Sequence, residues 1–356
     1  MEVEAKKRRF PQEKREQRRR KQEQFLKKVD KATVKKEREE EESKKLEAQK
    51  LLEQEKPMKD DYTVSVALPG SILENAQSLE LRTYLAGQIA RAATIFCVDE
   101  LIVFDEQGQG PRTTEGEFTG IGKKGNCCVQ MARILQFLEC PQYLRKAFFP
   151  KHQDLQYAGL LNPLDAPHHA RQNDKVPYRE GVVLNRPVSA GKGSFVDCGL
   201  VKEVQIDRHL QPGIRVTVKM DTGTKGHAVS PRAPHTDGGL YWGYSVRLAP
   251  SLSCVMTECP YSGGYDLMVG TSERGESVYD HELPSFRHLL VVLGGLHGLE
   301  AAVTGDQKLQ VSDPQPLFDL YLNTCPGQGS GTIRTEEALL ITLTTLRPKI
   351  MQSGLC

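Results

Sequence analysis

Two glycine-rich segments near the carboxyl end most constrain what this chain can fold into. The first, Gly-Gly-Leu-His-Gly at 294–298, follows the apolar run 289–293. The second spans residues 323–334 and precedes Thr335, a favoured helix N-cap, and an apolar helical pattern that we expect to stop near Pro348. In α/β proteins, a strand, a glycine turn and a helix in this order bring backbone amides to a ligand. We therefore predict one small-molecule site shared by the two turns.

The glycine spacing excludes two common nucleotide sites. Residues 294–298 lack the G-x-G-x-x-G order of a dinucleotide-binding turn, and neither segment continues into the Gly-Lys-Ser/Thr of a P-loop. Kinases and NAD-dependent dehydrogenases are therefore disfavoured. The structural alternative, that these glycines only form tight turns, stays open at this stage.

Charge separates an amino-terminal arm from the rest of the chain. Residues 1–58 contain 20 Lys/Arg and 14 Asp/Glu, a net charge of +6, and their only aromatic residues are Phe10 and Phe25. Such a segment cannot bury a core of its own, so we predict a disordered or helical arm. Its clusters 6–9 and 18–21 are typical of nuclear localisation signals, of a nucleic-acid arm, or of a solvated charge run.

Cysteine usage and hydropathy bear on the compartment. The nine cysteines form no C-x-x-C pair, and several lie among apolar residues, which indicates reduced thiols in an intracellular protein. We recognise no signal peptide and no eighteen-residue apolar run, so we expect neither secretion nor a membrane span.

Residues 60–175 show a strand–helix–strand–helix order. Strands are predicted at 63–68 and 98–105, and helices at 78–95 and 125–140. This order predicts an α/β fold with a mainly parallel sheet. The apolar stripe of the first helix comprises Leu81, Leu85, Ile89 and Ala92, and that of the second comprises Cys128, Met131, Leu135 and Leu138.

Residues 143–172 combine basic, aromatic and histidine side chains. The adjacent His168 and His169 could suggest a metal site, but no cysteine or third histidine has ligand spacing. We therefore predict a structural or RNA-contacting role and no metal.

Residues 178–250 change to short alternating strands, which predicts an inserted small β-barrel of OB-fold type. We assign the strands 201–206, 214–218 and 244–248 to it, and expect a mobile loop at 223–239. This segment holds 10 Lys/Arg and 6 Asp/Glu, a net charge of +4 that suits nucleic-acid binding. The alternative is a structural barrel with exposed charges. The predicted RNA-binding residues are Lys202, Arg215 and Arg247.

The α/β pattern resumes over residues 256–352. Strands are predicted at 265–269, 289–293 and 317–322, and the first of these is followed by Gly-Thr-Ser-Glu-Arg-Gly at 270–275, which we interpret as a third glycine loop.

These motifs together resemble a known family. Residues 270–275, the segment 291–300 and Cys-Pro-Gly-Gln-Gly-Ser-Gly-Thr-Ile-Arg-Thr-Glu-Glu-Ala at 325–338 are similar to the SPOUT class of S-adenosylmethionine-dependent RNA methyltransferases, in the branch with an inserted OB-fold domain. The resemblance covers roughly residues 60–350. It implies a carboxyl-terminal trefoil knot, a homodimer, and S-adenosylmethionine as cofactor. It places the cofactor against Arg274, Gly294, Gly295, Asn323, Gly327, Gln328, Ile333 and Thr335.

The Ile-Arg-Thr-Glu motif at 333–336 is also similar to enzymes that methylate N3 of uridine in ribosomal RNA. That nitrogen is weakly acidic, so Arg334 could stabilise the developing anion, and Glu336 or another group could take the proton. The alternative for both residues is helix-end electrostatics.

Three functions remain to be distinguished: an RNA methyltransferase, a non-catalytic RNA- or chromatin-binding protein that retains the fold, and a nucleotide-binding regulator. We favour the enzyme, because a scaffold would tolerate bulkier residues in the turns. We expect ribosomal RNA as partner and nuclear, including nucleolar, localisation, with a cytoplasmic alternative. Association with centromere, kinetochore or spindle is expected by family resemblance only.

Overall fold

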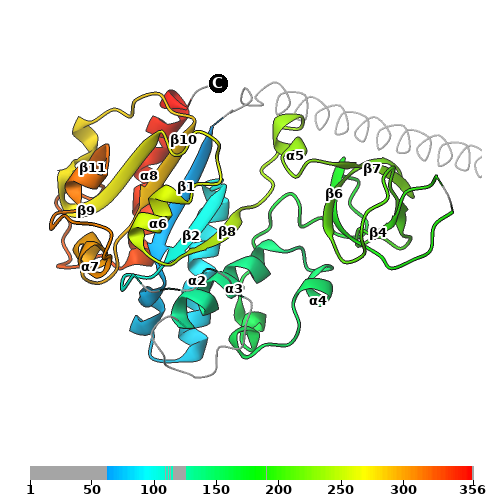
Figure 1. The fold of residues 1–356 in the computed structure, drawn as a ribbon, viewed down its shortest axis with the longest axis horizontal. Coiled ribbons are helices and arrows are strands. Elements are labelled where there is room, and N and C mark those ends of the chain that lie inside the picture. The colour runs from blue at the N-terminus through cyan, green and yellow to red at the C-terminus, as the bar shows by residue number, and fades with distance from the viewer. Residues whose placement is uncertain are drawn as a thin grey trace, which may run out of the picture. The chain divides into compact units, whose positions relative to one another are not determined.

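The computed structural model describes residues 62–108, 110, 112, 114, 126–189 and 191–354. The predicted arm at residues 1–58 therefore lies outside the described residues. Within them, six parallel strands form one sheet in the order β11-β9-β10-β1-β2-β8, and five further strands form a closed barrel (Figure 1). The prediction of an α/β fold with a mainly parallel sheet is confirmed. The knot stays a prediction.

The central strands of the main sheet, β1, β2 and β10, are short and largely buried. The six strands of the sheet are β1 (Thr63–Pro69), β2 (Glu100–Phe104), β8 (Ser245–Ala249), β9 (Leu267–Ser277), β10 (His288–Val292) and β11 (Leu320–Asn323). Alternate side chains point to opposite faces of a strand, so each face has its own apolar cluster. Val66 and Leu101 belong to the cluster on one face, and Ala67 and Ile102 to the cluster on the other.

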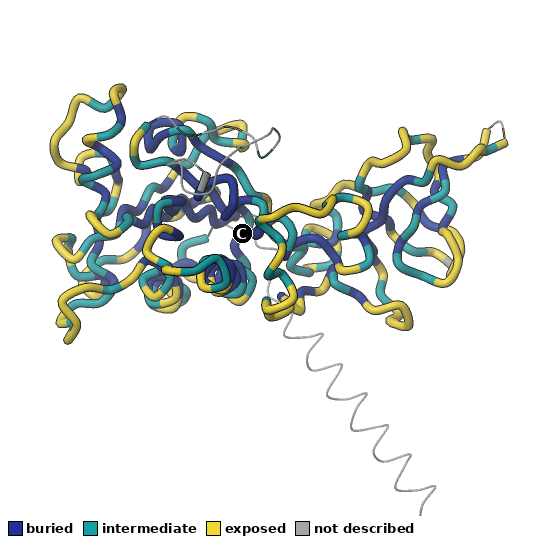
Figure 2. The backbone as a smooth tube through the Cα atoms, turned by 90° about the horizontal axis from the view of Figure 1, so that it is seen from below, coloured by how far each residue is buried: buried dark blue, intermediate teal, exposed yellow. Residues whose placement is uncertain are grey.

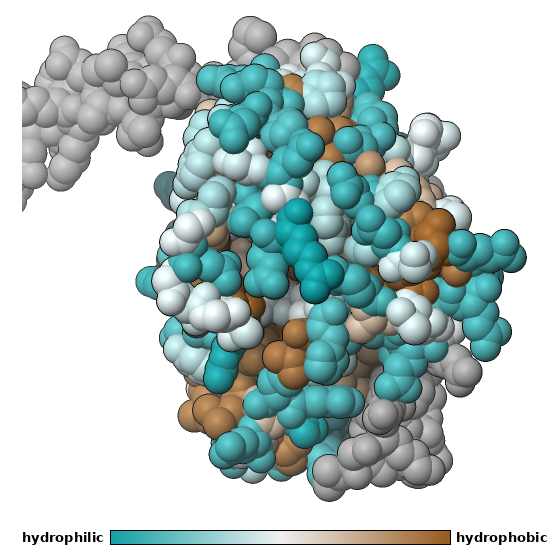
Figure 3. Space-filling model, turned by 90° about the vertical axis from the view of Figure 1, so that its left-hand side faces the viewer, coloured by the Kyte–Doolittle hydropathy of each residue, from teal (hydrophilic) through white to brown (hydrophobic). Residues whose placement is uncertain are grey.

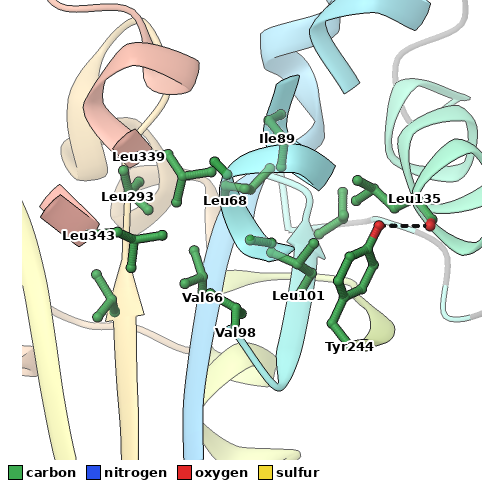
Figure 4. Packing of buried hydrophobic residues seen from close by; sticks show 14 of the residues in the cluster. Val66, Leu68, Ile89, Val98, Leu101, Leu135, Tyr244, Leu293, Leu339 and Leu343 are labelled. Atoms are coloured by element: carbon green, nitrogen blue, oxygen red, sulfur yellow. Dashed lines mark hydrogen bonds between the residues drawn. The ribbon is translucent and has the colours of Figure 1, made fainter. Parts of the chain in front are cut away.

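Three long helices supply apolar side chains to the first cluster, and two shorter helices supply them to the second. The long helices are α2 (Leu79–Ile95), α3 (Asn126–Glu139) and α8 (Thr335–Ser353); the shorter ones are α6 (Leu252–Thr257) and α7 (Gly298–Gly305). Figure 4 shows Leu339 and Leu343 of α8 and Ile89 of α2 near the central strands. In Figure 2, the buried residues lie mainly in the interior of the fold, and the exposed residues lie mainly on the peripheral loops.

Short helical segments fill several connections. They are η1 (Gly70–Asn75), α4 (Arg145–Phe148), η2 (Gln153–Leu155), η3 (Ala158–Leu160), α5 (Ala233–Thr236), η4 (Val278–Asp280) and η5 (Gln315–Leu317). No helix among the residues that the structure describes is long and apolar enough to cross a membrane.

The barrel strands are β3 (Tyr178–Val183), β4 (Phe195–Asp197), β5 (Val204–Gln205), β6 (Arg215–Thr222) and β7 (Lys225–Val229). The assignment of 244–248 to this barrel is wrong. That segment is β8, which pairs with β2 in the main sheet, because short alternation alone does not say which sheet a strand joins. The expected loop 223–239 is wrong as well, since it contains β7 and α5. An OB-type inserted domain stays a prediction.

Two of the three predicted RNA-binding residues are engaged inside the protein. Arg247 lies in β8, outside the barrel, and its Nε donates to Glu100 Oε1 at 2.8 Å. Arg215 binds two buried carboxylates, as described below. Lys202 is exposed in the loop before β5. Of the three, only Lys202 is placed to meet a phosphate without first breaking a buried ion pair.

The predicted third glycine loop is wrong, because β9 continues through residues 270–275 as a strand. A Cβ atom on Gly270 would lie 2.5 Å from the Phe318 ring, and one on Gly275 would lie 2.6 Å from the carbonyl carbon of Leu322. These glycines therefore allow β9 to pack closely against Phe318, which precedes β11, and against Leu322 within β11. They do not form a turn.

Two helix details also differ from expectation. Helix α8 continues past Pro348 to Ser353, and its N-cap residue is Arg334, with Thr335 inside the helix. In α2, Leu85, Ile89 and Ala92 are buried as expected, but Leu81 is exposed. Helix propensity at a single proline is thus overridden by the packing of Leu346 and Ile350, which are buried on either side of it.

A buried charge network joins the barrel to α3. The Arg215 guanidinium donates to both oxygens of Glu139 at 2.7 and 2.9 Å and to Glu180 Oε2 at 2.7 Å. The Nε2 atoms of His168 and His169 lie 2.8 and 2.7 Å from the carbonyl oxygen of Glu139. The histidine pair therefore contacts the last residue of α3. Its bonds supply partners for a helix-terminal carbonyl that has none within the helix.

The electrostatics of Glu139 follow from these contacts. Burial alone would raise its pKa, but the hydrogen bonds from His168 and Arg215 outweigh burial and lower the pKa to about 2. A carboxyl group whose pKa is lower in the folded state stabilises the fold at high pH. This contribution is complete above the ordinary pKa of 4.5 and is lost as the pH falls toward 2.

We expect Arg215→Ala to lower the free energy of unfolding by about 3–5 kcal/mol, because two buried carboxylates lose their partner. Arg186→Ala is the matched control, since it removes an exposed ion pair with Glu203 and should cost no more than about 1 kcal/mol. Urea unfolding at pH 7 and pH 3.5 measures both. The loss in Arg215→Ala should be smaller at pH 3.5. Equal losses in the two variants at pH 7 would contradict the role of the network.

Candidate cofactor and active site

A cavity of about 470 Å³ lies at the carboxyl ends of β9, β10 and β11. In open parallel sheets, this edge is where ligands bind. Its wall comes from the end of β9, the first glycine turn and the second glycine segment with the first turns of α8. The lining residues include Thr271, Ser272, Arg274, Leu293, Gly294, Gly295, His297, Glu300, Asn323, Gln328, Ile333, Thr335 and Ile341.

Seven of the eight predicted cofactor residues line this one cavity; they are Arg274, Gly294, Gly295, Asn323, Gln328, Ile333 and Thr335. The eighth, Gly327, does not line it, and a Cβ atom there would meet nothing within 4 Å. Its φ of +75° shows that glycine is used for a left-handed turn. Cofactor contact by the seven residues stays a prediction.

The first glycine turn is closed on itself by backbone packing. A Cβ atom on Gly294 would lie 2.6 Å from the carbonyl carbon of Gly298 and 2.7 Å from the nitrogen of Leu299. Gly298 has φ of +71° and begins α7. A side chain at Gly294 would therefore open the turn itself.

Side chains from the second segment hold the three walls together. Thr335 Oγ1 donates to the Gly294 carbonyl oxygen at 3.0 Å, which ties α8 to the first turn. Asn323 Nδ2 donates to the Glu273 carbonyl oxygen at 2.9 Å, and Asn323 Oδ1 accepts from the Cys325 amide at 3.0 Å. Both residues thus shape the cavity through bonds within the protein.

The mouth of the cavity carries an exposed ion pair. Arg274 Nη1 lies 3.3 Å from Glu300 Oε1, and three quarters of the Arg274 side chain is exposed. An exposed pair contributes little to stability, so Arg274 can exchange its partner for a ligand at small energetic cost.

The two predicted catalytic residues lie beside the cavity and are absent from its wall. Arg334 is exposed, and its backbone amide donates to Glu337 Oε2 at 3.0 Å. Glu336 is half-buried in the first turn of α8. The position of Glu336 in the first turn of α8 fits the alternative that its charge stabilises the helix dipole. Arg334 is the more accessible of the two residues.

Sequence reasoning missed Glu106, whose carboxylate packs against the first glycine turn at Gly295. The Ser71 hydroxyl donates to Glu106 Oε2, and burial raises the pKa of this carboxyl group. A Cβ atom on Gly295 would lie 2.5 Å from Glu106 Oε1, so the carboxylate lies directly against the turn. An acidic residue just past the carboxyl end of the buried strand β2 was the available signal.

Comparison with known proteins identifies the family of this chain. A family model described as "Putative RNA methyltransferase" matches residues 63–346. A Homo sapiens protein named 28S rRNA (uridine-N(3))-methyltransferase is 61% identical over 319 residues, which cover 88% of this chain and 85% of that protein. The Mus musculus protein of the same name is 65% identical over 300 residues, covering 82% and 78%.

Among solved structures, the SpoU methyltransferase AviRb from Streptomyces viridochromogenes is 12% identical, with a TM-score of 0.33 and coverage of 83% of this chain and 61% of that one. This likeness is too low to transfer site residues. The family match spans both halves of the main sheet, the barrel and the cavity wall. The chain belongs to this family of RNA methyltransferases.

Proposed function

We propose that this protein transfers a methyl group from S-adenosylmethionine to N3 of a uridine in large-subunit ribosomal RNA. The observation that carries the proposal is the single cavity formed by both glycine segments in a chain of the RNA methyltransferase family. The names of the human and mouse relatives, which are more than 60% identical over most of both chains, support the uridine and the ribosomal RNA.

The residues of the cavity fit such a cofactor. Its volume of about 470 Å³ lies within the range of small-molecule sites, and its wall alternates backbone amides of the glycine turns with apolar side chains such as Leu293, Ile333 and Ile341. Amides suit a carboxylate and ribose hydroxyls, and the apolar side chains suit an adenine ring. When bound, the cofactor supplies an electrophilic methyl group.

The protein must then orient the uridine and remove the N3 proton. Arg334 stands at the amino end of α8, between the lining residues Ile333 and Thr335. Its guanidinium and the positive end of the helix dipole would both stabilise a uridine anion. Glu336 remains the proposed proton acceptor on its position alone.

We assign RNA binding to the exposed basic residues of the barrel. Lys202 belongs to this group, whereas Arg215 is held by buried carboxylates and Arg247 lies in the main sheet. Phosphate contacts from such residues would position RNA without reading its sequence. The exposed basic residues are Arg186, Lys192, Lys202, Arg208, Lys219 and Lys225.

We further propose a homodimer through α2 and α8. Tyr84 and Ile95 of α2 and Leu340 of α8 line one shallow cavity of about 240 Å³, and between 41% and 55% of each residue is exposed. The face shown in Figure 3 is mostly hydrophilic, with small separate apolar patches. Exposed apolar side chains that gather on two neighbouring helices are typical of a protein interface.

Nuclear, including nucleolar, localisation fits this substrate, and the basic clusters 6–9 and 18–21 support it. Association with centromere, kinetochore or spindle rests on family resemblance. The competing function is a non-catalytic RNA- or chromatin-binding protein. The names of the human and mouse relatives favour the enzyme.

Wild-type protein should transfer labelled methyl groups from S-adenosylmethionine to ribosomal RNA, with 3-methyluridine identified by mass spectrometry. Gly294→Ala should lose both cofactor binding by calorimetry and transfer, because its Cβ atom collides with the Gly298 backbone. Gly329→Ala is the control, since a Cβ atom there meets nothing within 4 Å. Unchanged cofactor affinity in folded Gly294→Ala would show that the site is misplaced.

We expect Arg334→Lys to lower single-turnover methylation by about a hundredfold or more, with little change in cofactor affinity, because the planar guanidinium acts on the transition state. Arg287→Lys, at an exposed position before β10, is the control. If Arg334 were only structural, the variant would melt at a lower temperature while its folded molecules kept normal turnover.

Leu340→Glu should convert the dimer to a monomer, because it places a charge in the proposed interface. Val201→Glu is the matched control, since Val201 is 83% exposed in the barrel. Size-exclusion chromatography with light scattering measures the mass of each. A wild-type protein that elutes as a monomer, or a Leu340→Glu dimer of unchanged stability, would refute this interface.

A further inference from the structure

A second cavity, of about 570 Å³, lies where the amino ends of the central strands face the barrel. We call it the junction cavity. It is lined by Thr63 and Asp99 at the starts of β1 and β2, by Glu180 and Arg215 of the barrel, and by the segment 231–246 that connects the two. In Figure 1, α5 of this segment lies between the central strands and the barrel. The cofactor cavity lies at the opposite edge of the sheet. The junction cavity therefore has no role in the methyl transfer proposed above.

The wall of the junction cavity contains several aromatic rings. Trp242, Tyr244 and Tyr261 all line it, and Trp242 is the only tryptophan in the chain. The Trp242 ring is fixed, because its Nε1 donates to Glu180 Oε1 at 2.6 Å and its ring packs 6.1 Å from that of Tyr178. Fixed aromatic surfaces suit planar ligands, and stacking on nucleobases is their commonest use in RNA-binding proteins.

The acidic groups in the wall differ in what they can still bind. Glu139 and Glu180 are bound by Arg215, and Thr217 and Trp242 also donate to Glu180. Asp99 is different, since its Oδ2 accepts the Val64 amide at 2.8 Å. Carboxylate oxygens accept more than one hydrogen bond, so Asp99 retains capacity for an N–H group of a ligand.

Arg232 provides a cation at the mouth of the cavity. It is exposed, and its guanidinium lies 5.5 Å from the centroid of the Tyr261 ring. A cationic ligand would meet Arg232 and Arg215 in the same cavity, which disfavours an aromatic cage for methylated amines. An anionic ligand with a planar N–H-bearing ring is favoured instead.

From this combination we propose that the junction cavity binds one unpaired ribonucleotide of the RNA substrate, with its phosphate at Arg232, its base beside Trp242, and a base N–H donated to Asp99. The choice of RNA as the source of the nucleotide rests on the proposed function. The cavity itself rests on the contacts above. It provides a binding site for the RNA that is separate from the nucleotide to be methylated.

The ionisation of Asp99 gives this site a pH dependence. Burial raises the pKa of Asp99 to about 6, and the charged groups that act on it are His235 and Arg232 from the connecting segment and Glu100 from β2. The carboxylate is therefore mostly ionised at pH 7.5 and mostly protonated at pH 5. Affinity for a ligand that donates to the carboxylate should fall between these values.

Titration of the full chain with the four ribonucleoside 5′-monophosphates and with a single-stranded hexauridylate tests the proposal through Trp242 fluorescence. We expect saturable quenching by the hexauridylate and at least one monophosphate, and at least tenfold weaker binding at pH 5. Asp99→Asn should weaken binding of the hexauridylate at pH 7.5 about tenfold and remove its pH dependence, since asparagine can still accept the Val64 amide and keep the fold. Arg232→Ala should weaken it similarly, whereas Lys308→Ala, at an exposed position after α7 and outside both the barrel and the junction cavity, serves as the control.

Equilibrium dialysis with labelled nucleotide measures binding independently of fluorescence, and Trp242→Leu should bind more weakly in the same dialysis because the base loses its stacking surface. Wild-type protein that shows no saturable binding, or Asp99→Asn and Arg232→Ala with unchanged affinity, would overturn the site. Quenching by trimethyllysine in place of nucleotides would identify a cation site and would also overturn it. S-adenosylmethionine binding and methyl transfer are measured on the same preparations, so nucleotide binding without methyl transfer would reject the proposed function alone.

Discussion

The cofactor cavity depends on how closely the backbone of residues 294–298 approaches itself. The turn leaves no room for a Cβ atom at Gly294, and at Gly295 the space is occupied by the Glu106 carboxylate. Thr335 then fixes the turn to α8 through the Gly294 carbonyl oxygen. The position of one short turn thus determines where β10 ends, where α7 begins and how α8 is placed. The lining of the cavity therefore combines backbone of the two glycine segments with side chains of β9 and α8.

A second constraint acts at the other end of the molecule, where charge is buried in place of apolar surface. The pairing of Arg215 with Glu139 and Glu180 joins β6 and β3 of the barrel to the end of α3. Buried ion pairs often contribute little net stability compared with apolar packing, but removing one partner is strongly destabilising. Such a network therefore favours one arrangement of barrel and helix over alternatives. The glycine at 243, with φ of +86°, lets the chain pass within contact distance of Glu139 and His168.

The sequence predicted those features that depend on local periodicity. The helices at 79–95 and 126–139 and the strands at 63–69 and 288–292 follow from apolar spacing, and seven of the eight proposed cofactor residues line one cavity. It did not predict features that depend on distant partners. Gly270 and Gly275 suggested a loop, although they are needed for packing against Phe318 and Leu322. Residues 244–248 alternate as a barrel strand would, and only their pairing with β2 shows where they belong. Glu106 has no motif, since its importance comes from Gly295, nearly two hundred residues later.

Because the strands are parallel, the methyl-transfer site and the proposed nucleotide site lie at opposite edges of the sheet. All strand starts lie at one edge and all strand ends at the other, so chemistry at one edge is separated from binding at the other by the length of a strand. The seven residues of β1 correspond to a separation of roughly 20 Å at ~3.3 Å per residue. Within one chain, a nucleotide held beside Trp242 is therefore too far from the cofactor cavity to be the methylated one. Its contribution would lie in selecting and holding the RNA, while the glycine turns and α8 contribute to the reaction itself.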